Sequence, residues 1–181
     1  SNIGSALMAE RVGGVRQRAF LRNLGLTEKL SYEVPEIGAP LVPAARDWSN
    51  VTTMTVSFGH GIAVNAVQLV GAVATILNNG IPVHPTLLKR TTPVPQTEER
   101  VIKPETSAMI RALLRIVVTH GTAKAAKTEG YLLGGKTGTA DKVGGKHDYK
   151  GHGRVSSFIG AFPIHAPRYL VFALIDDPKG N

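Results

Sequence analysis

Apolar residues recur at helical spacing in three stretches of the chain. Ile3 to Leu24 carries apolar positions three and four residues apart, and Gly13-Gly14 interrupts the pattern, which predicts two consecutive short helices. Asn65 to Leu77 has an apolar stripe behind a capping asparagine, and Asn78-Asn79-Gly80 is a typical left-handed ending. A further helix is predicted to begin at Pro104, because proline favours the first helical position.

Extended patterns dominate the last part of the chain. Tyr131 to Ala140, Val155 to Phe162 and Tyr169 to Ile175 are predicted strands, and the last is apolar at successive positions, which predicts burial on both faces. Short connections between successive strands favour antiparallel pairing. Nearer the beginning, Thr27 to Asn50 is predicted to be irregular, and Val51 to Phe58 to be a short strand or an extended approach to a turn. The expected fold class is α+β, with an antiparallel sheet flanked by helices.

The composition is that of an ordinary globular domain. Of the 181 residues, 43% are apolar and 19% are charged, which disfavours disorder and suffices for one domain with its own core. No apolar run reaches the roughly 18 residues that suggest a membrane span, and the first residues lack the features of a signal peptide. Any anchor or export signal is therefore expected outside this chain. Cysteine is absent, which excludes disulfides and thiolate metal sites.

The formal net charge of +8 suits polyanionic partners in general. The Lys and Arg residues are spread along the chain, without a dense block or a recognition motif for nucleic acid. We interpret them as a solvated basic surface and expect no nucleic-acid binding.

The clearest chemical signal is the segment Gly134 to Ala140, which reads Gly-Gly-Lys-Thr-Gly-Thr-Ala. On a strand, alternation sends Lys136 and Gly138 to one face and Thr137 and Thr139 to the other. An ammonium group and two hydroxyls suit a carboxylate or an oxyanion, and the missing side chain at Gly138 allows close approach to the backbone. A free strand edge beside them could also pair with an extended peptide. Lys-Thr-Gly recurs by chance in many proteins, but here it follows a helix and precedes a polar loop and two further strands.

In that context Lys136 to Lys142 resembles the third motif of the class B, division-type penicillin-binding proteins. Ser1-Asn2-Ile3-Gly4 is similar to the end of their Ser-x-Asn motif, and Gly59 to Val64 is similar to a segment that opens a core helix. Gly121-Thr122-Ala123 and Ser157 to Pro163 also resemble family segments. The likeness covers nearly the whole chain. It implies part of the penicillin-binding protein/serine β-lactamase-like transpeptidase fold, with residues 1–181 as the C-terminal portion of one such domain.

The resemblance implies acyl transfer, in which a serine attacks the D-alanyl-D-alanine bond of a peptidoglycan stem peptide and β-lactams trap that serine. The catalytic residues would be Lys136, which sets the field around the nucleophile, and Asn2, which orients the substrate amide. Thr137, Gly138 and Thr139 would bind substrate, with the Thr139 N–H as half of the oxyanion hole. No cofactor or metal is implied. The expected partners are stem peptides, β-lactams and division proteins, at the periplasmic face of the bacterial inner membrane.

The sequence departs from the family pattern in one decisive respect. The family's first motif, Ser-x-x-Lys, is absent from it. No lysine lies three residues after Ser31, Ser49, Ser57 or Ser107. We therefore expect a fragment that lacks the nucleophile, does not acylate by itself and depends on a complementing piece or on self-association. Ser1-Asn2 could also be a remnant of tag removal.

Other functions remain open at this point. A non-catalytic β-lactam-sensing or division-scaffold module would share the fold, whereas a serine β-lactamase is disfavoured because no deacylating glutamate motif is found. His147 and His152 lie near Asp141 and Asp148, but their spacing matches no standard zinc pattern, so we expect no metal. His60, between two glycines, is interpreted as part of a turn.

Overall fold

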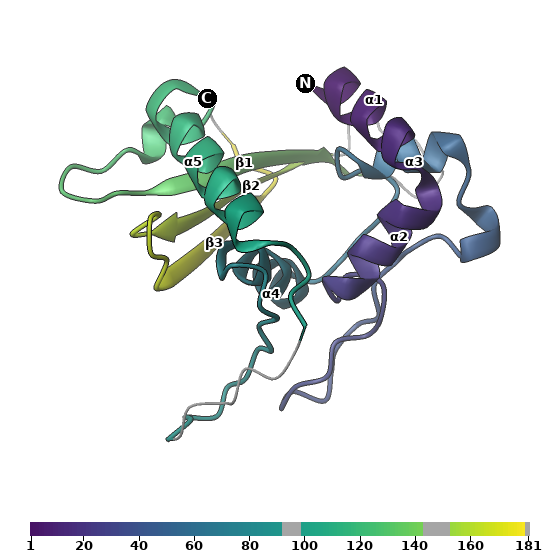
Figure 1. Cartoon of the computed structure of the whole chain (residues 1–181), viewed down its shortest axis with the longest axis horizontal. Helices are drawn as coiled ribbons and strands as arrows, with labels where there is room; N and C mark the ends of the chain where they lie inside the picture. Colours follow the sequence, from purple (N-terminus) through teal and green to yellow (C-terminus); the bar gives the residue numbers. More distant parts are fainter. Residues whose placement is uncertain (92–98, 143–152, 180–181) are drawn as a thin grey trace. The chain divides into compact units, whose positions relative to one another are not determined.

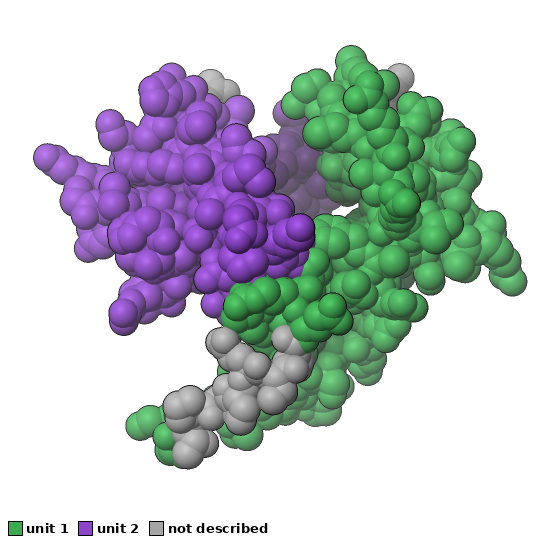
Figure 2. Space-filling model, in the orientation of Figure 1, with its two compact units in different colours: residues 1–76, 80–101 green, residues 77–79, 102–181 purple. Residues whose placement is uncertain are grey.

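The computed structural model describes residues 1–91, 99–142 and 153–179. The chain divides into two compact units, residues 1–76 with 80–101 and residues 77–79 with 102–181 (Figure 2). The first unit is built mainly from helices, whereas the second combines a helix with a sheet (Figure 1). None of the helices within the described ranges is long and apolar enough to cross a membrane.

Two consecutive helices open the first unit, α1 (Asn2–Val12) and α2 (Gly14–Asn23). Gly13 between them has a φ of 83°, a left-handed value that favours glycine, and this confirms the predicted interruption. Ser1 is the N-cap of α1, because its Oγ accepts a hydrogen bond from the backbone N–H of Gly4 at 3.2 Å.

The next part of the chain corrects one prediction. A 3-10 turn, η1, spans Ala45–Asp47, and helix α3 spans Asn50–Val56, so the strand predicted for Val51–Phe58 is wrong. The hydroxyl residues that suggested strand alternation serve the helix instead. Ser49 caps α3 by accepting a hydrogen bond from the Thr52 N–H at 3.1 Å. A serine cap of this kind begins a helix whatever the alternation behind it.

Helix α4 (Ala66–Leu77) has the ends that the sequence predicts. Asn65 caps it, since its Oδ1 accepts a hydrogen bond from the Gln68 N–H at 2.8 Å. Asn79 and Gly80 follow the helix with φ values of 55° and 78°, the expected left-handed ending. The buried core beside the helix joins Ala72 to residues that follow α2, and its buried and partly buried members are Leu24, Leu26, Leu21, Val64, Ile76 and Val101.

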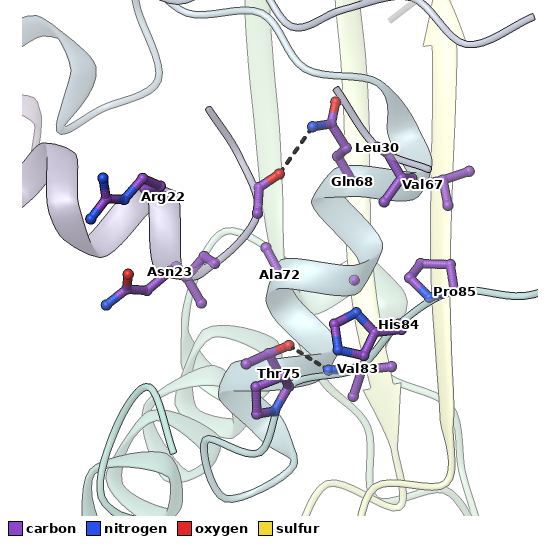
Figure 3. A pocket seen from close by; sticks show the side chains of 14 residues that line it. Arg22, Asn23, Leu30, Val67, Gln68, Ala72, Thr75, Val83, His84 and Pro85 are labelled. Carbon is purple, nitrogen blue, oxygen red and sulfur yellow. Dashed lines mark hydrogen bonds between the residues drawn. The ribbon is translucent and has the colours of Figure 1, made fainter. Parts of the chain in front are cut away.

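A pocket of about 250 Å³ adjoins this core, lined by the end of α2, by α4 and by residues 82–85 (Figure 3). The polar groups of α4 that line it are already paired. Gln68 Nε2 donates to the carbonyl oxygens of Gly25 at 3.0 Å and Glu28 at 2.7 Å, and Thr75 Oγ1 accepts from the Val83 N–H at 3.0 Å. These bonds tie two loops to α4, so the polar lining supports the fold.

Glu33 ties another pair of loops in the first unit. Its carboxylate accepts hydrogen bonds from the Thr86 hydroxyl and from the Leu87 N–H, and these bonds lower its pKa. A lowered folded-state pKa means that the link is fully present above the unfolded value, near 4.5, and is lost as the pH falls through the folded pKa. We expect the protection factor of the Leu87 amide, its exchange rate relative to an unstructured peptide at the same pH, to fall below that range and to be low at all pH values in Glu33→Ala. Equal exchange in both proteins at neutral pH would contradict this.

The second unit packs one long helix on a three-stranded antiparallel sheet (Figure 1). Helix α5 spans Pro104–His120 and begins at proline as predicted, and a 3-10 turn, η2, spans Lys124–Ala126. The strands lie in the order β1-β2-β3. Their bounds are β1 Gly134–Asp141, β2 Arg154–Phe162 and β3 Tyr169–Asp176. The predicted fold class, helices with an antiparallel sheet, is confirmed.

Two details of the sheet differ from the prediction. β1 begins at Gly134 rather than at Tyr131, and the carbonyl of Leu133 just before it accepts a hydrogen bond from Arg115 Nη1 at 2.7 Å. β3 is not buried on both faces by the described residues, because among them it pairs only with β2 and α5 packs against β1. Its large apolar side chains Val171, Leu174 and Ile175 are 50%, 53% and 60% exposed.

Candidate functional site

The candidate site lies along β1, which the fold presents as an edge strand. In the described ranges β1 pairs with β2 on one side and with no strand on the other. The register places Lys136 opposite Ile159, Thr137 opposite Phe158 and Gly138 opposite Ser157. The structure therefore brings the four predicted residues of β1 onto one accessible strand, where Lys136, Gly138 and Thr139 are exposed and Thr137 is partly buried.

The ladder also fixes which backbone groups of β1 are free. The Lys142 N–H donates to the Gly153 carbonyl at 3.1 Å, in register with the pairing of β1 and β2. Hydrogen-bonded and non-bonded pairs alternate along an antiparallel ladder, so residues 136, 138 and 140 bond toward β2. The N–H and C=O groups of Thr137 and Thr139 consequently point to the open edge. An extended chain could pair with these groups as an added strand.

Lys136 lies at this open edge. Its Nζ donates to the carbonyl oxygen of Thr137 at 2.6 Å, which agrees with an outward orientation of that carbonyl. No carboxylate of the described chain forms a salt bridge with it. An exposed ammonium with only a backbone carbonyl for a partner is available to an anionic ligand.

Thr122, to which the sequence alone gave no role, lies beside Thr137. The hydroxyls of Thr122 and Thr137 are 3.1 Å apart and share a hydrogen bond. Gly121 allows the chain to turn tightly at the end of α5, because a Cβ at this position would lie 2.8 Å from Val117 Cα. The resemblance of Gly121-Thr122-Ala123 to a family segment was the signal available in the sequence. The sequence does not show that Thr122 contacts Thr137, because this contact forms only when the chain folds back beside β1.

Three glycines shape β1 in different ways. A Cβ on Gly134 would lie 2.5 Å from Ile164 Cγ1, and one on Gly135 would lie 2.5 Å from both the Ile159 carbonyl oxygen and the Phe158 ring. At Gly138 it would meet only the Ser157 hydroxyl, at 2.7 Å. The first two glycines thus allow close internal packing. The group that approaches Gly138 within the protein is a single side-chain oxygen, which can rotate away.

Acidic residues at the far end of the sheet are engaged in ion pairs. Arg154 Nε lies 3.2 Å from Asp141 Oδ1, and Lys142 Nζ lies 2.5 Å from Asp176 Oδ1. His147, Asp148 and His152, the residues considered as metal ligands from the sequence, lie outside the described residues. Across residues 1–91, 99–142 and 153–179, no group of three or more His, Cys, Asp or Glu side chains could hold a metal ion.

Asn2 occupies a different unit from β1. It is the first residue of α1, directly after the capping Ser1, and it is exposed. Ser1 therefore stabilises the start of α1 as its N-cap, whether the first two residues are native or a remnant of tag removal.

A comparison with protein families identifies the family of this chain. The family model described as the penicillin-binding protein transpeptidase domain matches residues 1–181. The chain belongs to this family. The match extends over both units, which agrees with a likeness that is not confined to the Lys-Thr-Gly segment.

Curated relatives of this penicillin-binding protein family align with the whole chain. A "Probable peptidoglycan D,D-transpeptidase FtsI" of Caulobacter vibrioides is 38% identical over 190 residues, which cover 100% of this chain and 32% of the relative. The stage V sporulation protein D of Bacillus subtilis is 33% identical over 99% of this chain and 29% of its own length. The chain thus spans about a third of the length of these relatives.

Solved structures share the fold. The transpeptidase domain of penicillin-binding protein 3 from Burkholderia pseudomallei is 32% identical, with a TM-score of 0.90 over 98% of this chain and 54% of that one. Penicillin-binding protein 3 of Mycobacterium tuberculosis, in complex with aztreonam, is 31% identical, with a TM-score of 0.87 over 98% of this chain and 43% of that one.

Proposed function

We propose that the chain belongs to a peptidoglycan D,D-transpeptidase and forms the C-terminal portion of its transpeptidase domain. In this enzyme, the chain would bind the acyl donor through the donor's terminal carboxylate. The observation that carries the proposal is the open edge of β1, where two outward-facing backbone N–H groups, two hydroxyl residues and an ammonium without a described carboxylate partner occur within four residues. The transpeptidase relatives support the same reaction class.

Each residue of the strand has a role in this proposal. Thr137 and Thr139 hold the donor carboxylate with their hydroxyls, and the outward N–H of Thr139 stabilises the oxyanion of the tetrahedral intermediate. Lys136 lowers the electrostatic cost of bringing that carboxylate and the developing negative charge to the same place. Gly138 lets the donor backbone lie against β1, since only the Ser157 hydroxyl occupies the space beside it.

The remaining parts of the reaction lie beyond β1. The attacking serine, which the family's Ser-x-x-Lys motif would carry, has no match in this sequence, so we propose that it belongs to a part of the protein outside this chain. Asn2 is proposed to orient the amide of the donor. The proposed chemistry requires no metal or cofactor.

The biological setting follows the relatives and is also a proposal. An enzyme of this kind acts on peptidoglycan stem peptides during cell division and is trapped by β-lactams. It would act with division proteins at the periplasmic face of the inner membrane, held there by an anchor outside this chain.

Labelling with a fluorescent penicillin tests the proposal. The full-length protein is expected to form a stoichiometric covalent adduct that survives denaturation, because acylation joins the β-lactam carbonyl to the serine. The 181-residue chain by itself is expected to remain unlabelled. Labelling of the chain by itself would refute the absence of the nucleophile. A full-length protein that folds but is never labelled would favour a non-catalytic scaffold.

Thr122 gives the proposal a finer test. Thr122→Val keeps the shape of the side chain but removes the hydroxyl that is shared with Thr137. We expect the acylation rate of the full-length protein to fall by up to roughly tenfold, because one neutral hydrogen bond contributes about 0.5–1.5 kcal/mol. Thr119→Val is the matched control, since the Thr119 hydroxyl bonds only to α5 carbonyls and His120. Equal rates for both variants would remove Thr122 from the site.

A further inference from the structure

A second cavity, of about 280 Å³, lies in the first unit against one face of α2. Gly14, Val15, Arg18, Ala19 and Arg22 line it from the helix, and Ala45 and Trp48 line it from η1 and the residue after it. Successive positions about one turn apart share a helix face, so the α2 residues form one continuous wall. This cavity belongs to a different unit from β1.

The indole of Trp48 is held in place on the opposite wall. Its Nε1 donates to Gln17 Oε1 at 3.2 Å, and Gln17 Nε2 donates in turn to the Thr53 carbonyl at 2.9 Å. Gly14 allows the ring to approach α2, because a Cβ there would lie 2.8 Å from Trp48 Cδ1. The two hydrogen bonds and the close contact with α2 therefore fix the position of the indole ring.

Arg18 and Arg22 give the cavity a positive charge that no described residue neutralises. Neither side chain forms a salt bridge or a hydrogen bond to any described residue. They are four residues apart on α2, where like charges repel, and the helix contains no acidic residue. Arg18 Nε is moreover buried without a hydrogen-bond partner. A buried donor of this kind is rare in folded proteins and calls for an acceptor.

We propose that this cavity binds an acidic peptide segment of a partner protein. A carboxylate of the segment sits between Arg18 and Arg22, and a neighbouring apolar side chain packs on Trp48, Val15 and Ala19. The volume suits one or two side chains rather than a whole small-molecule ligand, whose pockets measure roughly 300–1,000 Å³. Tryptophan and arginine are also the residues that dominate binding energy at protein interfaces. Val15 is 87% exposed, so no described residue covers the apolar part of the cavity.

The test is a calorimetric titration of the full-length protein. The probe is the blocked tetrapeptide Glu-Leu-Asp-Leu, with Gln-Leu-Asn-Leu as its uncharged counterpart. We expect the acidic peptide to bind saturably, with an affinity that weakens as salt rises, and the amide peptide to bind at least about tenfold more weakly. A titration that does not saturate, or an equal affinity for both peptides, would overturn the proposal.

Three variants separate this site from general attraction to a basic protein. Arg18→Gln and Arg22→Gln are each expected to weaken the acidic peptide roughly tenfold in calorimetric titrations. Arg16→Gln is the matched control, because it removes the same charge from the same helix but does not line the cavity, and it is expected to leave binding unchanged. Arg22 is exposed, so its variant keeps the test decisive even if Arg18→Gln unfolds. An equal loss in all three variants, or inorganic phosphate competing as well as the acidic peptide, would contradict a peptide site.

Discussion

Replacing Lys136 by alanine is expected to slow acylation of the full-length protein by penicillin at least about 100-fold. Lys136 carries the only formal charge among the four residues of β1 that are proposed to contact the donor, and no described carboxylate neutralises it. Removing one preorganised hydrogen-bond donor directed at the oxyanion costs factors of roughly 100 to 1,000 in acyl-transfer sites, and we expect an effect of at least the lower size for the charged Lys136. The measurement is the second-order rate constant of acylation with a fluorescent penicillin.

Two further variants show whether the effect belongs to the position or to the charge. Lys124→Ala removes the same charge from η2, on the same unit, and is expected to acylate at the unmodified rate. Lys136→Arg keeps the charge but changes its shape, and should lie between the two, because a planar guanidinium does not replace a compact ammonium. A loss smaller than about threefold in Lys136→Ala, with the melting temperature unchanged, would remove Lys136 from the proposed chemistry.

The second large effect concerns stability. Gly135→Ala is expected to destabilise the protein by about 1–3 kcal/mol, because the added Cβ would lie 2.5 Å from the Ile159 carbonyl oxygen and from the Phe158 ring. The carbonyl belongs to the neighbouring strand of the sheet and cannot move without disturbing the pairing of β1 with β2. Denaturant unfolding followed by circular dichroism would show a lower midpoint with the same slope.

Gly138→Ala is the matched control on the same strand. Its Cβ would meet only the Ser157 hydroxyl, which can change rotamer, so the free energy of unfolding should fall by less than about 1 kcal/mol. The same substitution is nevertheless expected to slow acylation, since it places a methyl group where the donor backbone is proposed to lie. Equal destabilisation by both substitutions would contradict the account in which Gly135 is required for packing and Gly138 for donor binding.

The sequence predicted the elements whose ends carry explicit local signals. The break at Gly13, the asparagine cap before α4 and the left-handed turn after it were all predictable, since each depends on one or two residues. The strand predicted for Val51–Phe58 failed because a serine cap outweighed an alternating pattern. Local chemistry therefore decided both the correct and the incorrect assignments.

Long-range contacts account for what the sequence could not show. Among the described residues β3 is exposed because it pairs only with β2 and because α5 packs on β1, and a run of apolar residues reveals neither contact. Thr122 became a candidate only once the turn after α5 was seen to bring it to Thr137. Lys136 to Thr139, by contrast, were predictable as a group because they are consecutive on one strand.

The most direct test of the central claim is a crystal structure of the full-length protein acylated by ampicillin. We predict that the carboxylate of the bound drug lies within hydrogen-bonding distance of the Thr137 and Thr139 hydroxyls. The carbonyl oxygen of the ester should accept a hydrogen bond from the Thr139 N–H at the open edge of β1. A drug carboxylate bound elsewhere, with that edge left unoccupied, would contradict the assignment of β1 as the donor-binding strand.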